Sequence, residues 1–447
     1  MTGPHAHQHH QLLRILGVAF GIAVTLGNMI GAGILRTPSA IATSVGSAAI
    51  ILALWLAGAL HTTLSANIEA ELGTALPFVG GPYVFSRRAL GDVAGLIVGW
   101  SLWGAKLAGI AAAAVSFANF LVILIPAAQP HQTGIAIAVQ VVIFGANILG
   151  LREGRELQKT TSFLKAVLLL FFALAAVFVT PASAAAQNSL PAALTWVGII
   201  GAYKLIRGAY SGWDAAIYFT EESNAPGTTL PKSLFVGLAV ASFLYLAVNA
   251  ALLHALGVAG VASSALPFMG VLESAAGDSA SVLFAVGAMI TVLSVVNANV
   301  MTAPRILFAL SRDRLLPHAL SEVNDGGSPY IAMLMTAVGS IALAATGKFV
   351  LVFGLIGTLN TVAALLSVVA FFALRRREPA LPRPFRAFGY PVLPALAFAI
   401  EATLLVLFNA ADRDGFLAAV ALSAACVPFA WIARRRALDK RVPDETP

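Results

Sequence analysis

The sequence contains few charged residues. Asp, Glu, Lys and Arg make up 11% of its 447 residues, whereas soluble proteins carry about 25%. The mean hydropathy is +0.87, and apolar runs of about 20 residues, each long enough to cross a bilayer as a helix, recur along the whole chain. The composition excludes a soluble protein and predicts an all-α integral membrane protein embedded in the lipid bilayer.

Cysteine and long polar segments are also scarce. The single cysteine, Cys426, excludes an internal disulfide and a paired-cysteine metal site. The polar connections are at most about 20 residues, too short to form a soluble domain. The function is therefore expected within the membrane, with no metal and no cofactor. A polar tail explains the four histidines at the N-terminus, and metal binding is the alternative; they are His5, His7, His9 and His10.

The apolar runs predict twelve transmembrane helices. The expected spans are 15–42, 46–71, 93–125, 134–151, 162–180, 193–220, 232–256, 279–311, 329–347, 349–374, 391–411 and 415–434. Lys and Arg gather in the loops on one side, and only Lys348 and Arg413 fall on the other. By the positive-inside rule, the terminal tails 1–14 and 435–447 are expected in the cytoplasm. This topology explains the net charge of +7 without a nucleic-acid partner.

Two of the expected spans contain glycine-rich interruptions near their middle. The first is expected at 30–34, within GNMIGAGILRTP (27–38), and the second at 207–213, about half the bundle later. Paired breaks at corresponding positions of two inverted repeats mark the substrate site in secondary transporters. The repeats would be 15–180 and 193–374, with 391–434 as two additional helices. A small-residue packing motif is the alternative explanation of Gly27 and Gly31.

The exposed helix ends at such breaks suit an α-amino acid. Free amides at the start of the resumed helix, near Ala32, Gly33 and Ile34, favour a carboxylate. Unpaired carbonyls before a break, at residues 28–30 and 207–209, favour an ammonium group. The sequence therefore predicts that the substrate backbone binds between the two breaks.

Charged residues within the spans are the second group of candidates, because a charge in the bilayer is costly. Lys165 either holds a cation's place beside the first break and titrates during transport, or snorkels to the headgroups. Ser294 is expected at a similar depth to Lys165. Lys106 either contacts a substrate side chain or pairs with Glu69 or Asp214. Arg207 either lines the outer vestibule, where it would attract anions and help Lys106 to select the substrate side chain, or reaches outward to water.

Several motifs resemble the amino acid–polyamine–organocation superfamily, in particular bacterial amino acid permeases and L-type exchangers. They run in the family order and cover almost the whole chain: GNMIGAGILRTP (27–38), AELGTALPFVGGPYVFSRRALG (70–91), YSGWDAAIYFTEESNAPGTTLPKSL (210–234), NANVMTAPRILFALSRDRLLP (297–317) and LPRPFRAFGYP (381–391). The resemblance implies a LeuT-type 5+5 inverted repeat plus two additional helices, and alternating access around a mid-membrane site.

The resemblance also assigns roles to individual residues. Substrate binding carries over to Ile30, Gly31, Ala32, Gly33, Ile34, Gly208, Ala209, Tyr210 and Ser211. Lys165 stands where sodium-coupled relatives bind sodium, so sodium dependence is not expected. The sequence departs from the family where it has AYSGW rather than AYDGW, and where Lys106 and Arg207 carry charge. L-type exchangers have a cysteine-linked partner subunit, which we do not expect here because Cys426 lies within the last span.

These observations predict a secondary active amino acid transporter, a symporter coupled to protons or an antiporter, in the bacterial inner membrane. An enzyme is not expected, because no catalytic constellation converges at one depth. A polyamine or amine antiporter is an alternative, although Lys106, Lys165 and Arg207 would repel a polycation. A sensor that binds amino acids without transporting them is a second alternative, which the lack of a signalling domain disfavours.

Overall fold

The computed structural model describes residues 17–429, apart from 79, 150, 178, 180–193, 265, 277–278, 325–326, 348, 412 and 427. Over these ranges the chain consists of helices and connecting segments, without a β-strand. The predicted tails 1–14 and 435–447 and the predicted loop 181–193 lie outside the described residues.

Helices follow one another along the chain with short connections. The first half contains α1 (Val18–Met29), α2 (Ala32–Val45), α3 (Ala48–Ala75), α4 (Pro82–Leu90), α5 (Asp92–Leu124), the 3-10 helix η1 (Pro126–His131), α6 (Gln132–Leu149) and α7 (Leu151–Val177). The second half contains α9 (Trp196–Ala209), η2 (Trp213–Glu222), α10 (Pro226–Ser263), α11 (Pro267–Ala276), α12 (Ser279–Arg312), η3 (His318–Ser321), α13 (Tyr330–Ala345), α14 (Phe349–Arg377), α15 (Val392–Ala411) and α16 (Arg413–Ala424).

Eight helical stretches within the described residues are long and apolar enough to cross a membrane. They are Val18–Val45, Ala48–Ala75, Asp92–Leu124, Pro126–Ile148, Pro226–Ser263, Val282–Arg312, Leu355–Arg377 and Val392–Ala410. The shorter helix Tyr330–Ala345 is also apolar. The prediction of an all-helical, multi-pass membrane protein is confirmed at this level.

Two connections that were predicted as loops form helices instead. The segment around 257–278 continues α10 to Ser263 and then forms α11, which packs on α7, α10 and α12. Phe268 and Val271 are buried in that contact, so a short apolar face is enough to fix the helix against its neighbours. Between α3 and α5 the chain forms α4, which begins at Pro82, where the fixed φ of proline favours a helix start.

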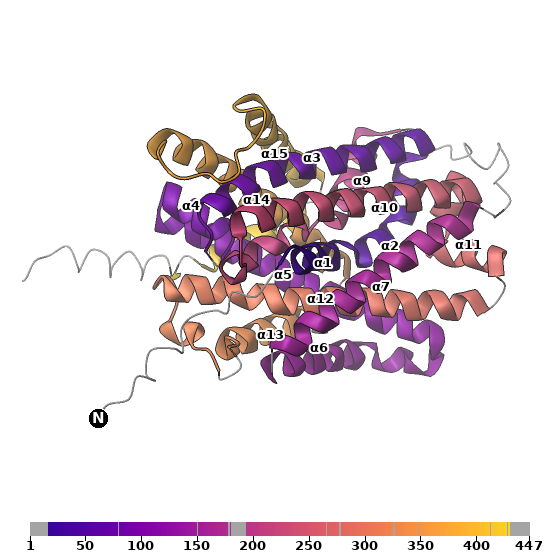
Figure 1. Cartoon of the computed structure of the whole chain (residues 1–447). Helices are drawn as coiled ribbons and strands as arrows, with labels where there is room; N and C mark the ends of the chain where they lie inside the picture. The colour runs from indigo at the N-terminus through magenta and orange to yellow at the C-terminus, as the bar shows by residue number, and fades with distance from the viewer. Residues whose placement is uncertain are drawn as a thin grey trace, which may run out of the picture.

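The first interrupted helix lies at the centre of the bundle. The axes of the long helices α3, α10 and α12 are roughly parallel, and α1 and α2 lie between them (Figure 1). The stretch Val18–Val45 is the most buried of the eight apolar stretches. The helix α1 packs on α7, α10 and η2, and α2 packs on α9 and α10. A break in this helix is therefore surrounded by the helices of the bundle rather than by lipid, as a transmembrane break requires.

Candidate functional site

The first helix break consists of Ile30 and Gly31. The helix α1 ends at Met29, both break residues adopt extended backbone conformations, and α2 begins at Ala32. The interruption is shorter than the predicted 30–34, because Ala32, Gly33 and Ile34 already belong to α2. As the first residues of a helix, they have amides without an intrahelical carbonyl partner.

The second break follows Ala209, the last residue of α9. The chain turns through residues 210–212, where Gly212 adopts a left-handed conformation with φ of +93°, and resumes as the 3-10 helix η2. A Cβ atom on Gly212 would lie 2.6 Å from the Cβ of Asn28. Glycine is therefore required here both by the positive φ and by the close approach of the first break.

Two side chains hold the breaks in place. Lys165 is fully buried, and its Nζ donates hydrogen bonds to the carbonyl oxygens of Gly27 (2.6 Å) and Ile30 (2.7 Å). This burial excludes the snorkelling alternative for Lys165. The Tyr245 hydroxyl lies 2.6 Å from the carbonyl oxygen of Met29 and 3.0 Å from that of Ala209, within reach of both breaks.

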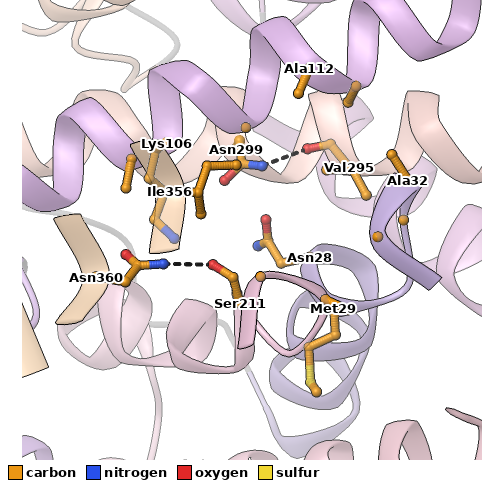
Figure 2. A pocket seen from close by; sticks show the side chains of 18 residues that line it. Asn28, Met29, Ala32, Lys106, Ala112, Ser211, Val295, Asn299, Ile356 and Asn360 are labelled. Carbon is orange, nitrogen blue, oxygen red and sulfur yellow. Dashed lines mark hydrogen bonds between the residues drawn. The ribbon is translucent and has the colours of Figure 1, made fainter. Parts of the chain in front are cut away.

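These contacts involve three of the six carbonyls that were expected to bind an ammonium group. Ile30 accepts from Lys165, and the single hydroxyl hydrogen of Tyr245 is donated to Met29 or to Ala209, both of which lie within hydrogen-bond distance. Another acceptor is available beside them: Asn28 is 6% exposed, and its Oδ1 has no hydrogen-bond partner among the described residues. Its side chain projects into the space between the breaks (Figure 2). A buried, unpartnered acceptor of this kind is costly unless a ligand donates to it.

The breaks face a cavity between α1, α2, α5, α9, α12 and α14. Its lining residues are Asn28, Met29, Gly31, Ala32, Gly33, Ala105, Lys106, Gly109, Ala112, Ala113, Gly208, Ala209, Ser211, Gly212, Val295, Asn299, Ile356 and Asn360. Ala32 and Lys106 lie on opposite sides of the cavity, with Asn28 between them (Figure 2). The structure thus brings the start of α2 and the end of α9 to one cavity.

The predicted site residues divide into two groups. Of the nine residues of the two breaks that were predicted to bind the substrate, six line the cavity: Gly31, Ala32, Gly33, Gly208, Ala209 and Ser211. Ile30, Ile34 and Tyr210 are fully buried outside this lining. The Tyr210 hydroxyl donates a hydrogen bond to the carbonyl oxygen of Trp55 on α3, so its side chain packs the second break against the bundle.

Lys106 lines the cavity and has a counter-ion. Its Nζ lies 3.8 Å from Oδ1 of Asp214 and 4.9 Å from the centre of the Tyr218 ring. The Tyr218 hydroxyl in turn donates to Oδ2 of Asp214 at 2.9 Å. Of the two carboxylates considered from sequence, Asp214 is therefore a partner of Lys106, and the ammonium still borders the cavity.

Arg207 lies neither in an outer vestibule nor in contact with water, the two environments predicted for it. Its Nη2 lies 2.6 Å from Oε1 of Glu401 on α15, and the guanidinium is buried. His61 Nε2 lies 3.1 Å from the same carboxylate oxygen, and His61 Nδ1 lies 3.0 Å from the Tyr203 hydroxyl. Arg207 neither reaches water nor belongs to the cavity lining. The carboxylate within the apolar run VLPALAFAIEATLLVLF (392–408) was the sequence signal for such a partner, and it was missed.

Ser294 joins α12 to α7 one turn before Lys165. Its hydroxyl lies 3.0 Å from Oγ1 of Thr161 and 3.4 Å from Nε2 of Gln158. Asn297 on α12 also donates to Oε1 of Gln158, at 3.2 Å. Ser294 thus belongs to a polar cluster that fixes the helix carrying Lys165.

Three asparagines of the cavity were missed as side-chain contributors: Asn28, Asn299 and Asn360. Asn360 Nδ2 donates to the Ser211 hydroxyl at 2.8 Å, and Asn299 Nδ2 donates to the carbonyl oxygen of Val295 at 3.2 Å. Amides within apolar spans were the available signal. Across the described ranges, no three His, Cys, Asp or Glu side chains gather closely enough to hold a metal ion.

Comparison with known proteins gives a consistent set of relatives. A family model described as "Amino acid permease" matches residues 17–427. The chain is similar to the branched-chain amino acid permease BcaP of Bacillus subtilis (strain 168), with 30% identity over 412 residues and 86% of both chains covered. It is also similar to the serine/threonine exchanger SteT of the same organism, with 26% identity and 87% and 89% covered. The large neutral amino acids transporter small subunit 2 of Mus musculus is 24% identical, with 87% and 75% covered.

Proposed function

The chain belongs to the amino acid permease family, and we propose that it is a secondary active transporter that moves amino acids across the membrane by alternating access. The relatives are transporters rather than enzymes. The observation that carries the proposal is the meeting of two helix breaks at one buried cavity. Enclosed cavities at paired breaks suit a substrate that is released alternately to either side.

The two ends of an α-amino acid match the two breaks. The substrate carboxylate binds the amides of Ala32 and Gly33, which line the cavity, because the positive end of the α2 dipole and unpaired N–H groups favour an anion there. The substrate ammonium binds Oδ1 of Asn28, whose lone pairs have no partner among the described residues. Every α-amino acid has these two groups, so this part of the cavity would bind any of them.

Lys165 is the proposed coupling residue. When charged, it donates to the carbonyls of Gly27 and Ile30 and so stabilises the first break. Loss of its proton weakens that stabilisation, because hydrogen bonds from a neutral amine are weaker than those from an ammonium group, so that proton movement and rearrangement of the break are linked. Ser294, through Thr161 and Gln158, holds α7 against α12 during this change. Transport is then proton-coupled symport, or exchange if the proton remains bound.

The topology follows from the same proposal. Twelve spans form two inverted repeats of five, α1–α7 and α9–α14, and α15 and α16 are additional helices. The termini face the cytoplasm, and the membrane is the bacterial inner membrane. Cys426 is buried within the chain, which supports the absence of a cysteine-linked partner subunit.

A polycationic amine fits this cavity less well than an amino acid. The Lys106 ammonium borders the cavity, and the start of α2 carries a partial positive charge. An amine offers no anionic group for either of them. No described contact favours an amine over an amino acid.

The test is counterflow in proteoliposomes with a panel of labelled amino acids and amines, with and without an inward proton gradient. Counterflow of at least one α-amino acid supports the proposal, and stimulation by the gradient supports symport. Binding of amino acids without any flux would indicate a sensor. Counterflow of putrescine alone would replace the proposal with amine antiport.

A further inference from the structure

The cavity has a polar end remote from the start of α2. In Figure 2, Lys106 and the hydrogen-bonded pair Asn360–Ser211 lie on the side opposite Ala32. Asn299 projects toward the same space from α12. If the substrate backbone binds at the breaks, as proposed above, the substrate side chain extends toward this polar end. The following inference rests on that proposed function.

The Lys106 ammonium is available to a ligand. Its distance of 3.8 Å from Oδ1 of Asp214 is an ion-pair contact but is too long for a hydrogen bond. Its other neighbour is the face of the Tyr218 ring. An ammonium group has three N–H donors and no acceptor, and the carboxylate of Asp214 already accepts from Tyr218. The donors of Lys106 can therefore serve an acceptor inside the cavity.

The neighbouring polar groups also offer donors. The Ser211 hydroxyl accepts from Asn360 Nδ2, which leaves its own hydrogen to donate to a ligand. One hydrogen of the Asn299 amide bonds the carbonyl of Val295, and the second is left over. Hydrogen-bond donors thus reach the cavity from three elements: Lys106 on α5, Ser211 at the second break and Asn299 on α12.

We propose that the transported amino acid has a side chain ending in an acceptor oxygen, a carboxylate or an amide carbonyl, and that Lys106 is the specificity-determining residue. An aliphatic side chain at this end would bury the ammonium and the neighbouring donors without partners, which is unfavourable. A site built to hydrogen-bond a substrate group rejects an analogue that lacks the group far more strongly than an apolar pocket rejects a different size.

The test measures competition for counterflow by the oxygen-bearing group (aspartate, asparagine, glutamate and glutamine) against valine, leucine and isoleucine. We expect the oxygen-bearing group to compete at concentrations about tenfold lower or more. Comparison of each acid with its amide then distinguishes a carboxylate from an amide carbonyl. In K106M, which has a similar length and no donors, the preference should fall about tenfold or reverse.

Removing Lys106 leaves Asp214 without its counter-ion, and K106M alone could fail to fold. The double variant K106M/D214N removes both charges and should show the same change of preference, with folding checked by thermal unfolding. Equal competition by both groups in the unaltered chain overturns the inference and leaves amino acid transport intact. If the folded double variant keeps the preference for oxygen-bearing amino acids, Lys106 does not determine the specificity. If no amino acid competes, the proposed function itself is contradicted.

Discussion

A Cβ atom on Gly33 would lie 2.8 Å from the Cα of Ala209, so the two helix breaks meet backbone to backbone at these two residues. The backbone cannot yield as a flexible side chain would, and G33A should push α2 away from α9. We expect amino acid binding to weaken by about tenfold or more, the change that 1.4 kcal/mol of lost binding produces. Equilibrium binding to the purified variant measures this effect.

The matched control for G33A is G145A on α6. Gly145 lies within a helix, and a Cβ atom there would meet nothing within 4 Å. Because alanine is the better helix former by about 0.5–1 kcal/mol, G145A should be neutral or slightly stabilising, with unchanged binding. Equal loss of binding in both variants would show that the contact between the breaks is not the cause.

Lys165 should be necessary for coupling rather than for binding alone. In K165M the carbonyls of Gly27 and Ile30 lose their donor, while the apolar length of the side chain is kept. We expect accumulation driven by an inward proton gradient to be lost. The control is K232M, because Lys232 is exposed at the start of α10 and its loss should change nothing.

The result for Lys165 separates the two transport modes. Gradient-driven accumulation by K165M as strong as in the unaltered chain would exclude Lys165 as the proton carrier. Uptake by the unaltered chain that ignores the gradient would identify the protein as an exchanger. In that case Lys165 keeps only the role of stabilising the first break.

The buried pair of Arg207 and Glu401 should contribute strongly to stability. The carboxyl of Glu401 is fully buried, and E401Q leaves the Arg207 guanidinium without a charged partner. Breaking such a buried pair costs about 3–5 kcal/mol, whereas E378Q, which breaks the exposed pair of Glu378 with Arg88, should cost about 0–1 kcal/mol. Thermal unfolding in detergent compares the two variants. Equal melting temperatures would contradict the assignment.

The sequence was sufficient for the class of fold and for the position of both breaks. Apolar runs and paired glycine-rich stretches depend on local composition, and the first interruption was found within three residues of its observed place. The short helices α4 and α11 were missed, because each is stabilised by packing on neighbours rather than by a long apolar run. Helices of that length are marginal without tertiary contacts.

The candidate site was only partly predictable, because partners far apart in sequence decide which groups are free. The carbonyls of Met29 and Ala209 looked available, but Tyr245 from α10 lies within hydrogen-bond distance of both. Arg207 looked like a cavity residue, but Glu401, 194 positions later, binds it away from the cavity. The same three-dimensional packing left the Asn28 side chain as the unpartnered acceptor, which no local pattern distinguishes from a structural asparagine.

The central claim is that the breaks bind the α-carboxylate and the α-ammonium of one amino acid. Equilibrium binding by isothermal titration tests it most directly, with the tightest-binding amino acid, its methyl ester and its N-acetyl derivative. The account predicts that the free amino acid binds and that either modification weakens binding by about tenfold or more, the equivalent of 1.4 kcal/mol. Equal affinity for all three compounds would contradict it.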